Sequence, residues 1–173
     1  MKKILTILLL VVTFQINAQH IALEKLQFII GEWSGTGGGF GNSTSTITAS
    51  YNFVMNKKYI EVKHESKFKP TEKNPKGEHH IDNGFISFDT SRKKVVYRQF
   101  NNEGYVNQYI LNEAISTPTS LIFETETIEN FVPGGKARLT INKISNTEIE
   151  TIFDVSFPNK EYSCFGTNKL IKN

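Results

Sequence analysis

Cysteine is almost absent from this chain of 173 residues, because Cys164 is the single one. No disulfide can therefore form within the chain. Tryptophan is equally scarce, with Trp33 alone, and no histidine follows His80. Stability must come from the burial of apolar side chains, which the 13 Phe and 6 Tyr residues can supply.

Long apolar runs are also lacking, apart from a short one near the start. The basic pair Lys2 and Lys3 precedes an apolar run over residues 4–12, and small or polar residues follow as far as Ala18 and Gln19. This run is too short to span a bilayer, which needs about 20 apolar residues. The pattern predicts a signal peptide over the first 19 residues, cleaved after Ala18 or Gln19. A retained amphipathic or anchoring helix is the alternative.

Removal of the signal peptide would leave one domain, residues 20–173, in a periplasmic or secreted protein. We expect no stable membrane anchor after cleavage. Loss of Lys2 and Lys3 lowers the formal net charge from +3 to +1. The basic clusters at residues 67–69 and 92–94 fall at expected strand ends and turns. Such small, separate clusters do not indicate nucleic-acid binding, which needs a concentrated positive field.

The remaining chain is organised around the apolar run that ends at Gly31 and the tryptophan that follows it. Residues 23–30 are the one helical candidate, with Leu23, Leu26 and Ile30 at helical spacing. Beyond Gly31 the hydrophobic period changes to two, as in β-strands. We predict that Trp33 closes one end of a β-barrel beside the helical segment.

Ten strands joined by short turns are expected. Their ranges are 32–40, 44–54, 59–68, 80–88, 94–100, 105–112, 121–128, 137–144, 147–157 and 162–171. A single all-β domain of this kind is either a sandwich or an up-and-down antiparallel barrel. We favour the barrel because it leaves no edge strands. The glycines of the first strand predict a sharp bend or a close backbone approach.

The motifs that often carry chemistry are weak here. The glycine-rich stretch 35–41 leads into a strand rather than a helix, which argues against phosphate binding. In a strand His79 and His80 would face opposite sides, and His80 with Asp82 would still lack a further metal ligand. We place these residues at the edge of a surface loop and expect no metal. No Ser-His-Asp, Cys-His or paired-carboxylate arrangement supports an enzyme.

Several short motifs resemble a known group of barrels. The residues Gly31-Glu32-Trp33-Ser34-Gly35-Thr36-Gly37 resemble the start of calycin barrels, the lipocalin and fatty-acid-binding group. Together with residues 83–89, 97–100 and 104–105, they are most similar to nitrobindin-type barrels and related exported bacterial domains of unknown function. The resemblance covers residues 23–171. It implies a calycin-like barrel of about ten strands with an internal cavity.

In nitrobindin-type proteins the cavity holds haem, ligated by a histidine near the C-terminus. This chain departs from that pattern, because its last expected strand contains Cys164 and no histidine. A thiolate can ligate haem iron, but a lone cysteine is more often a small hydrophobic residue. We therefore expect no cofactor.

Three side chains are predicted to line a ligand cavity. His64 shares a strand face with Ile60 and Val62, so its side chain should point inward, where it needs a hydrogen-bond partner or a ligand. Tyr51, or Ser66, could satisfy it internally. The sequence assigns ligand contacts to Tyr51, His64 and Tyr109.

These residues suggest an exported binding module for a small hydrophobic or amphipathic molecule. Two alternatives stay open. One is an enzyme that acts on a lipid-like or haem-like molecule in the same cavity. The other is a structural or interaction barrel filled by its own side chains.

Overall fold

The structure is a computed structural model that describes residues 22–39, 43–72 and 74–173. The predicted signal peptide lies outside these ranges, as does Phe40, the expected end of the first strand. Within the described ranges, no helix is long and apolar enough to cross a membrane.

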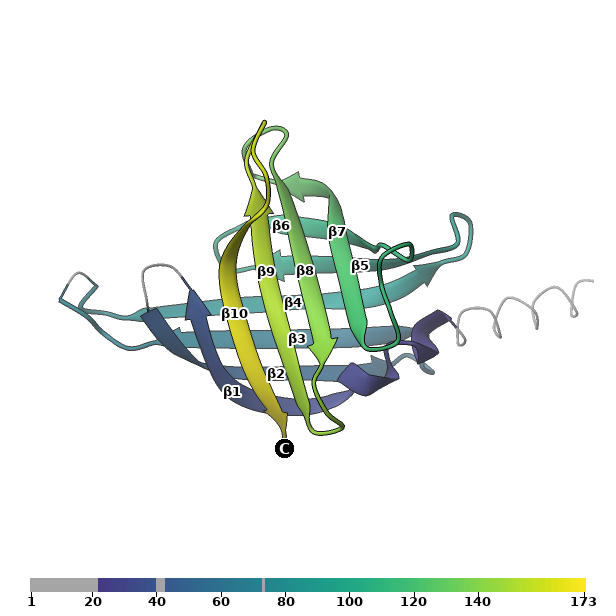
Figure 1. Ribbon diagram of the computed structural model, residues 1–173, viewed down its shortest axis with the longest axis horizontal. Coiled ribbons are helices and arrows are strands. Elements are labelled where there is room, and N and C mark those ends of the chain that lie inside the picture. Colours follow the sequence, from purple (N-terminus) through teal and green to yellow (C-terminus); the bar gives the residue numbers. More distant parts are fainter. Residues whose placement is uncertain (1–21, 40–42, 73) are drawn as a thin grey trace, which may run out of the picture.

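Ten antiparallel strands form a closed barrel in which each strand pairs with its neighbours in sequence and β1 pairs with β10 (Figure 1). The strands are β1 (Gly31–Gly39), β2 (Ser43–Val54), β3 (Tyr59–Phe68), β4 (Glu78–Asp89), β5 (Lys94–Asn101), β6 (Val106–Leu111), β7 (Ser120–Glu129), β8 (Lys136–Lys143), β9 (Glu148–Ser156) and β10 (Ser163–Lys172). The predicted all-β, up-and-down barrel is confirmed. Every predicted strand is present, with ends no more than two residues from those expected.

Alternation of apolar and polar residues decides which face of each strand points inward. On β3 the side chains of Ile60 and Val62 are buried, whereas Glu61 and Lys63 lie on the outer face as an ion pair at 3.0 Å. A shift of one residue would exchange these two faces, so the pattern fixes the register. The same rule directs the buried Tyr109 and Leu111 of β6 into the barrel.

The segment before β1 is helical, as predicted, but it is not one regular helix over residues 23–30. A short helical turn at residues 22–24 leads to a 3₁₀-helix, η1 (Gln27–Ile29), with hydrogen bonds from Leu26 N to Leu23 O and from Ile29 N to Leu26 O. Leu23, Leu26 and Ile29 are fully buried, at the three-residue spacing of a 3₁₀-helix. The predicted stripe ended at Ile30, which is half-buried instead.

Trp33 and this N-terminal segment fill one end of the barrel. The Trp33 side chain is 1% exposed and belongs to the same buried cluster as Leu23, Leu26 and Ile29. Its indole Nε1 donates a hydrogen bond of 2.7 Å to the carbonyl oxygen of Ile29. The structure thus agrees with the predicted closure of one barrel end by Trp33.

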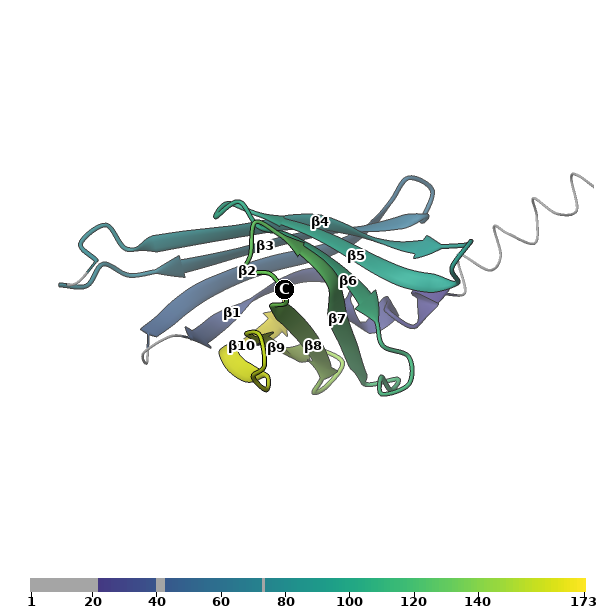
Figure 2. The ribbon, with the colours of Figure 1, turned by 90° about the horizontal axis from the view of Figure 1, so that it is seen from above.

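The barrel is flattened into two walls. Strands β2 to β6 form one wall, and β7 to β10 cross in front of them at a steep angle (Figures 1 and 2). At the seam between β1 and β10, a Cβ atom on Gly35 would lie 1.9 Å from the carbonyl oxygen of Lys169. The predicted close backbone approach along β1 is therefore present at this glycine.

Candidate ligand-binding cavity

The end of the barrel opposite Trp33 is hollow. A cavity of about 1320 Å³ extends from buried tyrosines near the middle of the barrel to the exposed hairpin loops. At this end β1, β3, β5, β7 and β9 finish, and β2, β4, β6, β8 and β10 begin. The barrel is thus filled by side chains at the Trp33 end and hollow at the opposite end.

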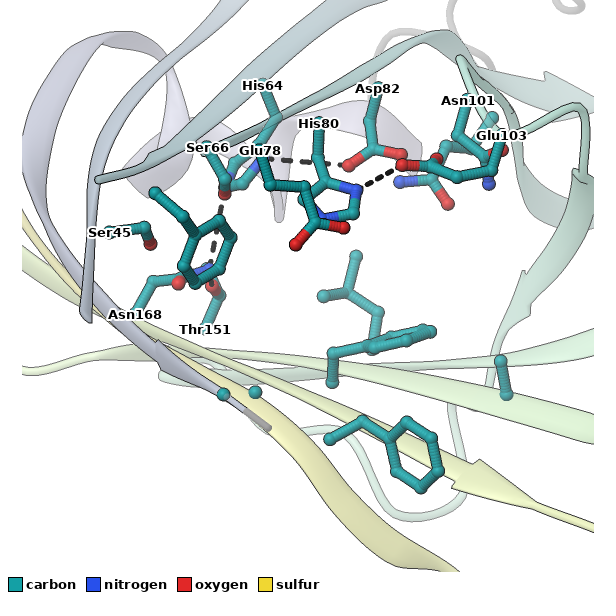
Figure 3. Close-up of a pocket in the computed structure, with 18 of the residues that line it drawn as sticks. Ser45, His64, Ser66, Glu78, His80, Asp82, Asn101, Glu103, Thr151 and Asn168 are labelled. Carbon is teal, nitrogen blue, oxygen red and sulfur yellow. Dashed lines mark hydrogen bonds and ion pairs between the residues drawn. The ribbon is translucent and has the colours of Figure 1, made fainter. Parts of the chain in front are cut away.

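The two walls of the cavity differ in chemistry. The wall formed by β2 to β6 is mainly polar, and its inward side chains include Ser45, His64, Ser66, His80, Asp82 and Asn101 (Figure 3). Gln99 and Asn107 line the same wall. The opposite wall, on β7 to β9, is mainly apolar and includes Ile128, Ala137, Leu139, Phe153 and Val155. An amphipathic molecule would meet a matching surface on each side.

All three residues assigned to ligand contact by the sequence line this cavity. Tyr51 and Tyr109 are 4% and 1% exposed and lie at its floor, whereas His64 lies on the polar wall. The structure adds Tyr97, whose ring stacks on Tyr109 with the centroids 5.7 Å apart. Alternation along β5 could have identified Tyr97, because the charged residues Lys94 and Arg98 mark the opposite face of this strand.

Gln99 forms hydrogen bonds with two polar side chains at the floor of the cavity. Its Oε1 accepts hydrogen bonds from Asn107 Nδ2 at 2.9 Å and from the Tyr109 hydroxyl at 3.4 Å. Burial raises the pKa of Tyr51, Tyr97 and Tyr109, and the carboxylate of Asp82 raises the pKa of each further. These phenols therefore stay protonated and can donate hydrogen bonds across the physiological pH range.

His64 lies between two polar side chains from other strands. Its Nε2 is 3.5 Å from Nδ2 of Asn168, which also donates to Thr151 Oγ1 at 2.9 Å. Its Nδ1 is 3.6 Å from Asp82 Oδ2, is buried, and has no hydrogen-bond partner among the described residues. The sequence suggested Tyr51 or Ser66 as the partner, and the structure instead brings Asn168 from β10 to this ring.

Gly37 makes this contact possible. Strands β3 and β10 are separated in the barrel by β1 and β2, yet His64 on β3 contacts Asn168 on β10. A Cβ atom on Gly37 would lie 2.2 Å from Asn168 Oδ1 and 2.8 Å from Ser45 Oγ. The missing side chain therefore leaves room for Asn168 to reach across the flattened interior.

At the mouth of the cavity, strand β4 begins at Glu78, two residues before the expected start at His80. His80 and Asp82 lie in the strand, within the expected range 80–88, and line the cavity instead of forming only a surface loop edge. His79 faces outward and contacts Glu65 at 3.0 Å, as the alternation predicted. His80 contacts Glu78 at 2.8 Å and also Glu103. Among the residues that the structure describes, no group of three His, Cys, Asp or Glu side chains could hold a metal ion.

A row of aromatic rings borders the apolar side of the mouth. Tyr105 and Phe131 meet edge to face with centroids 5.7 Å apart, Phe131 lies 5.7 Å from Phe157, and Phe157 lies 6.1 Å from Phe165. Tyr105, Phe131 and Phe157 come from the segments that join β5 to β6, β7 to β8 and β9 to β10, and Phe165 lies on β10. They continue the apolar wall to the surface.

His64, His80 and Cys164 are the side chains that bear on the question of haem ligation. Both ring nitrogens of His64 face neighbouring side chains, and those of His80 face Glu78 and Glu103. Cys164 is exposed and lies outside the cavity lining, with Sγ 3.7 Å from Gly166 O. Cys164, the thiol that the sequence offers in place of a C-terminal histidine ligand, therefore does not face the cavity.

No protein-family profile matches this sequence, and no curated protein matches it. Among solved structures, Rv2717c from M. tuberculosis has a TM-score of 0.63 and 13% identity, over 88% of this chain and 97% of that one. EF1p2_mFAP2b bound to DFHBI and a redesigned β-barrel have TM-scores of 0.47 and 0.43, with 13% and 12% identity. They cover 86% and 85% of this chain and 97% and 93% of their own. The likeness of this chain to solved structures thus extends to the β-barrel fold alone.

Proposed function

We propose that this protein is a binding module that holds a small hydrophobic or amphipathic molecule in the open half of its barrel. The observation that supports the proposal is the cavity of about 1320 Å³ with one polar and one apolar wall. Ligand pockets in proteins are usually about 300–1,000 Å³ and mostly apolar, with a few polar groups that orient the ligand. The resemblance of residues 31–37 to calycin barrels is consistent with this function.

Polar groups at the floor and on the polar wall would orient the ligand. Tyr51 and Tyr109 supply hydroxyl groups at the floor, and His64 supplies a ring on the polar wall. The contacts of His64 are 3.5 and 3.6 Å long, so its ring is weakly held by the protein. A ligand that enters the cavity would therefore compete only with weak internal contacts of His64.

Replacement of His64 tests whether its role is binding or folding. We expect His64→Leu to change the free energy of unfolding by less than about 1 kcal/mol, because the lost contacts are long. The same change should tighten the binding of Nile red, a neutral hydrophobic dye, by about fivefold, since it removes a polar group from the cavity wall. Fluorescence titration and urea denaturation measure the two effects.

Lys63→Leu is the matched control for this experiment. It introduces the same side chain at the residue directly before His64 on β3, which lies on the outer face. It should leave dye affinity unchanged. Two results would contradict the proposal: a wild-type protein that does not bind Nile red saturably, or a His64→Leu variant that loses stability while its dye affinity stays constant.

We also propose that the protein acts outside the cytoplasm, in the periplasm or as a secreted protein. The support is the basic, apolar and small-residue pattern of the first 19 residues. Protein recovered from its own cells should lack these residues, because cleavage is expected after Ala18 or Gln19. Intact mass spectrometry measures this directly, and a mass that includes Lys2 and Lys3 would refute export by this route.

A further inference from the structure

The ionisable side chains that face the cavity are mainly acidic. Asp82, Glu78 and Glu103 contribute carboxylates, and His64 and His80 are the basic partners beside them (Figure 3). With histidine counted as neutral, this wall carries three negative charges. An anionic ligand would therefore be repelled by the wall that has to hold its polar end.

Lysines at the rim do not offset these charges inside. Lys67 and Lys69 border the cavity, but both are exposed. The ammonium group of Lys67 lies 3.2 Å from Glu65 on the outer face, where Glu65 also contacts His79. No arginine lines the cavity in the described ranges. The ammonium group of Lys67 is therefore engaged on the outer face, and Lys69 stays exposed at the rim.

Asp82 is the carboxylate set deepest in the polar wall. Its side chain is 24% exposed, and its ion-pair partner among the described residues is His64, at 3.6 Å. That separation is too long for a hydrogen bond, so the carboxylate oxygens keep their capacity to accept. Its field reaches the floor, where it contributes to the raised pKa of Tyr51, Tyr97 and Tyr109.

We infer that the ligand carries a hydrogen-bond-donating or cationic head, such as a primary amine, which binds beside Asp82. Its apolar body lies along the opposite wall, against Leu139, Phe153 and Val155. Carboxylates and phosphates are excluded as heads, because Asp82, Glu78 and Glu103 would repel them. This assignment rests on the proposed binding function and narrows it to one class of ligand.

Three compounds with the same apolar chain test the inference. Dodecylamine, dodecanol and dodecanoate are each titrated against Nile red bound to the wild-type protein, below the concentrations at which they form micelles. The amine should displace the dye at a concentration about tenfold lower than the acid, with the alcohol between them. Asp82→Asn should reduce this difference to about twofold, mainly by weakening amine binding.

Glu61→Gln is the control variant, because it removes one negative charge from the outer face of β3. It should leave the order and spacing of the three compounds unchanged. The ranking of the three compounds is measured on the wild-type protein. A poorly folded Asp82→Asn protein would therefore not block the test. Equal displacement by all three compounds, or tighter binding of dodecanoate, would overturn the inference and leave the binding function intact. Failure of the dye and all three compounds to bind would refute the binding function itself.

Discussion

Replacement of Trp33 by alanine should lower the free energy of unfolding by about 3–5 kcal/mol, the usual range for a buried large aromatic residue. The side chain is 1% exposed and packs in the cluster that contains Leu23, Leu26 and Ile29. Its removal also leaves the Ile29 carbonyl without the 2.7 Å hydrogen bond from the indole. The loss should appear as a lower urea midpoint in equilibrium denaturation.

Phe100→Ala provides the comparison. Phe100 is also a large aromatic residue on a strand, but it is 53% exposed. Its replacement should cost less than about 1 kcal/mol, because more than half of its surface stays in water in the folded protein. If Trp33→Ala lost no more stability than Phe100→Ala, Trp33 would not be a structural plug of the barrel.

Replacement of Gly35 by alanine should destabilise the protein by about 3 kcal/mol, at the upper end of the cost of overpacking. The added Cβ atom would lie 1.9 Å from the Lys169 carbonyl oxygen, and this backbone atom cannot move without disturbing the pairing of β1 with β10. Thermal unfolding followed by circular dichroism should show the loss as a lower melting temperature.

Gly38→Ala separates this steric effect from the general effect of placing alanine in β1. A Cβ atom on Gly38 would meet nothing within 4 Å. This variant should stay within about 0.5 kcal/mol of the wild type. Equal stability of the Gly35→Ala and Gly38→Ala proteins would show that β1 can move away from β10 at little cost.

Strands could be predicted from the sequence because their signal is local. On β3 every second residue is charged, and this pattern by itself gives the facing of Ile60, Val62 and His64. The turns of the N-terminal segment were less predictable. Leu23, Leu26, Ile29 and Ile30 fit both a 3₁₀ and an α-helical spacing, and only the contacts with the barrel select the first.

The candidate site could be predicted only in part, for the same reason. The alternation of side chains along each strand places Tyr51, His64 and Tyr109 on inward faces. It does not show which residues of distant strands contact them. The contact between His64 and Asn168 depends on the flattened barrel and on the space left by Gly37. The predicted strand 80–88 contained Asp82, but the alternation along it does not show that this end of β4 borders a cavity.

The pairing of β1 with β10 also has a consequence for the order in which the protein folds. Nine of the ten strand pairs join neighbours in sequence and can form as hairpins, whereas the last joins Trp33 to Lys172. The backbone N–H of Asn173 then donates to Glu32 O at 3.0 Å. Contacts so distant in sequence form slowly, because a long loop must close first. Until β10 arrives, β1 and β9 are open edges that could pair with another chain, so aggregation competes with folding up to the final step.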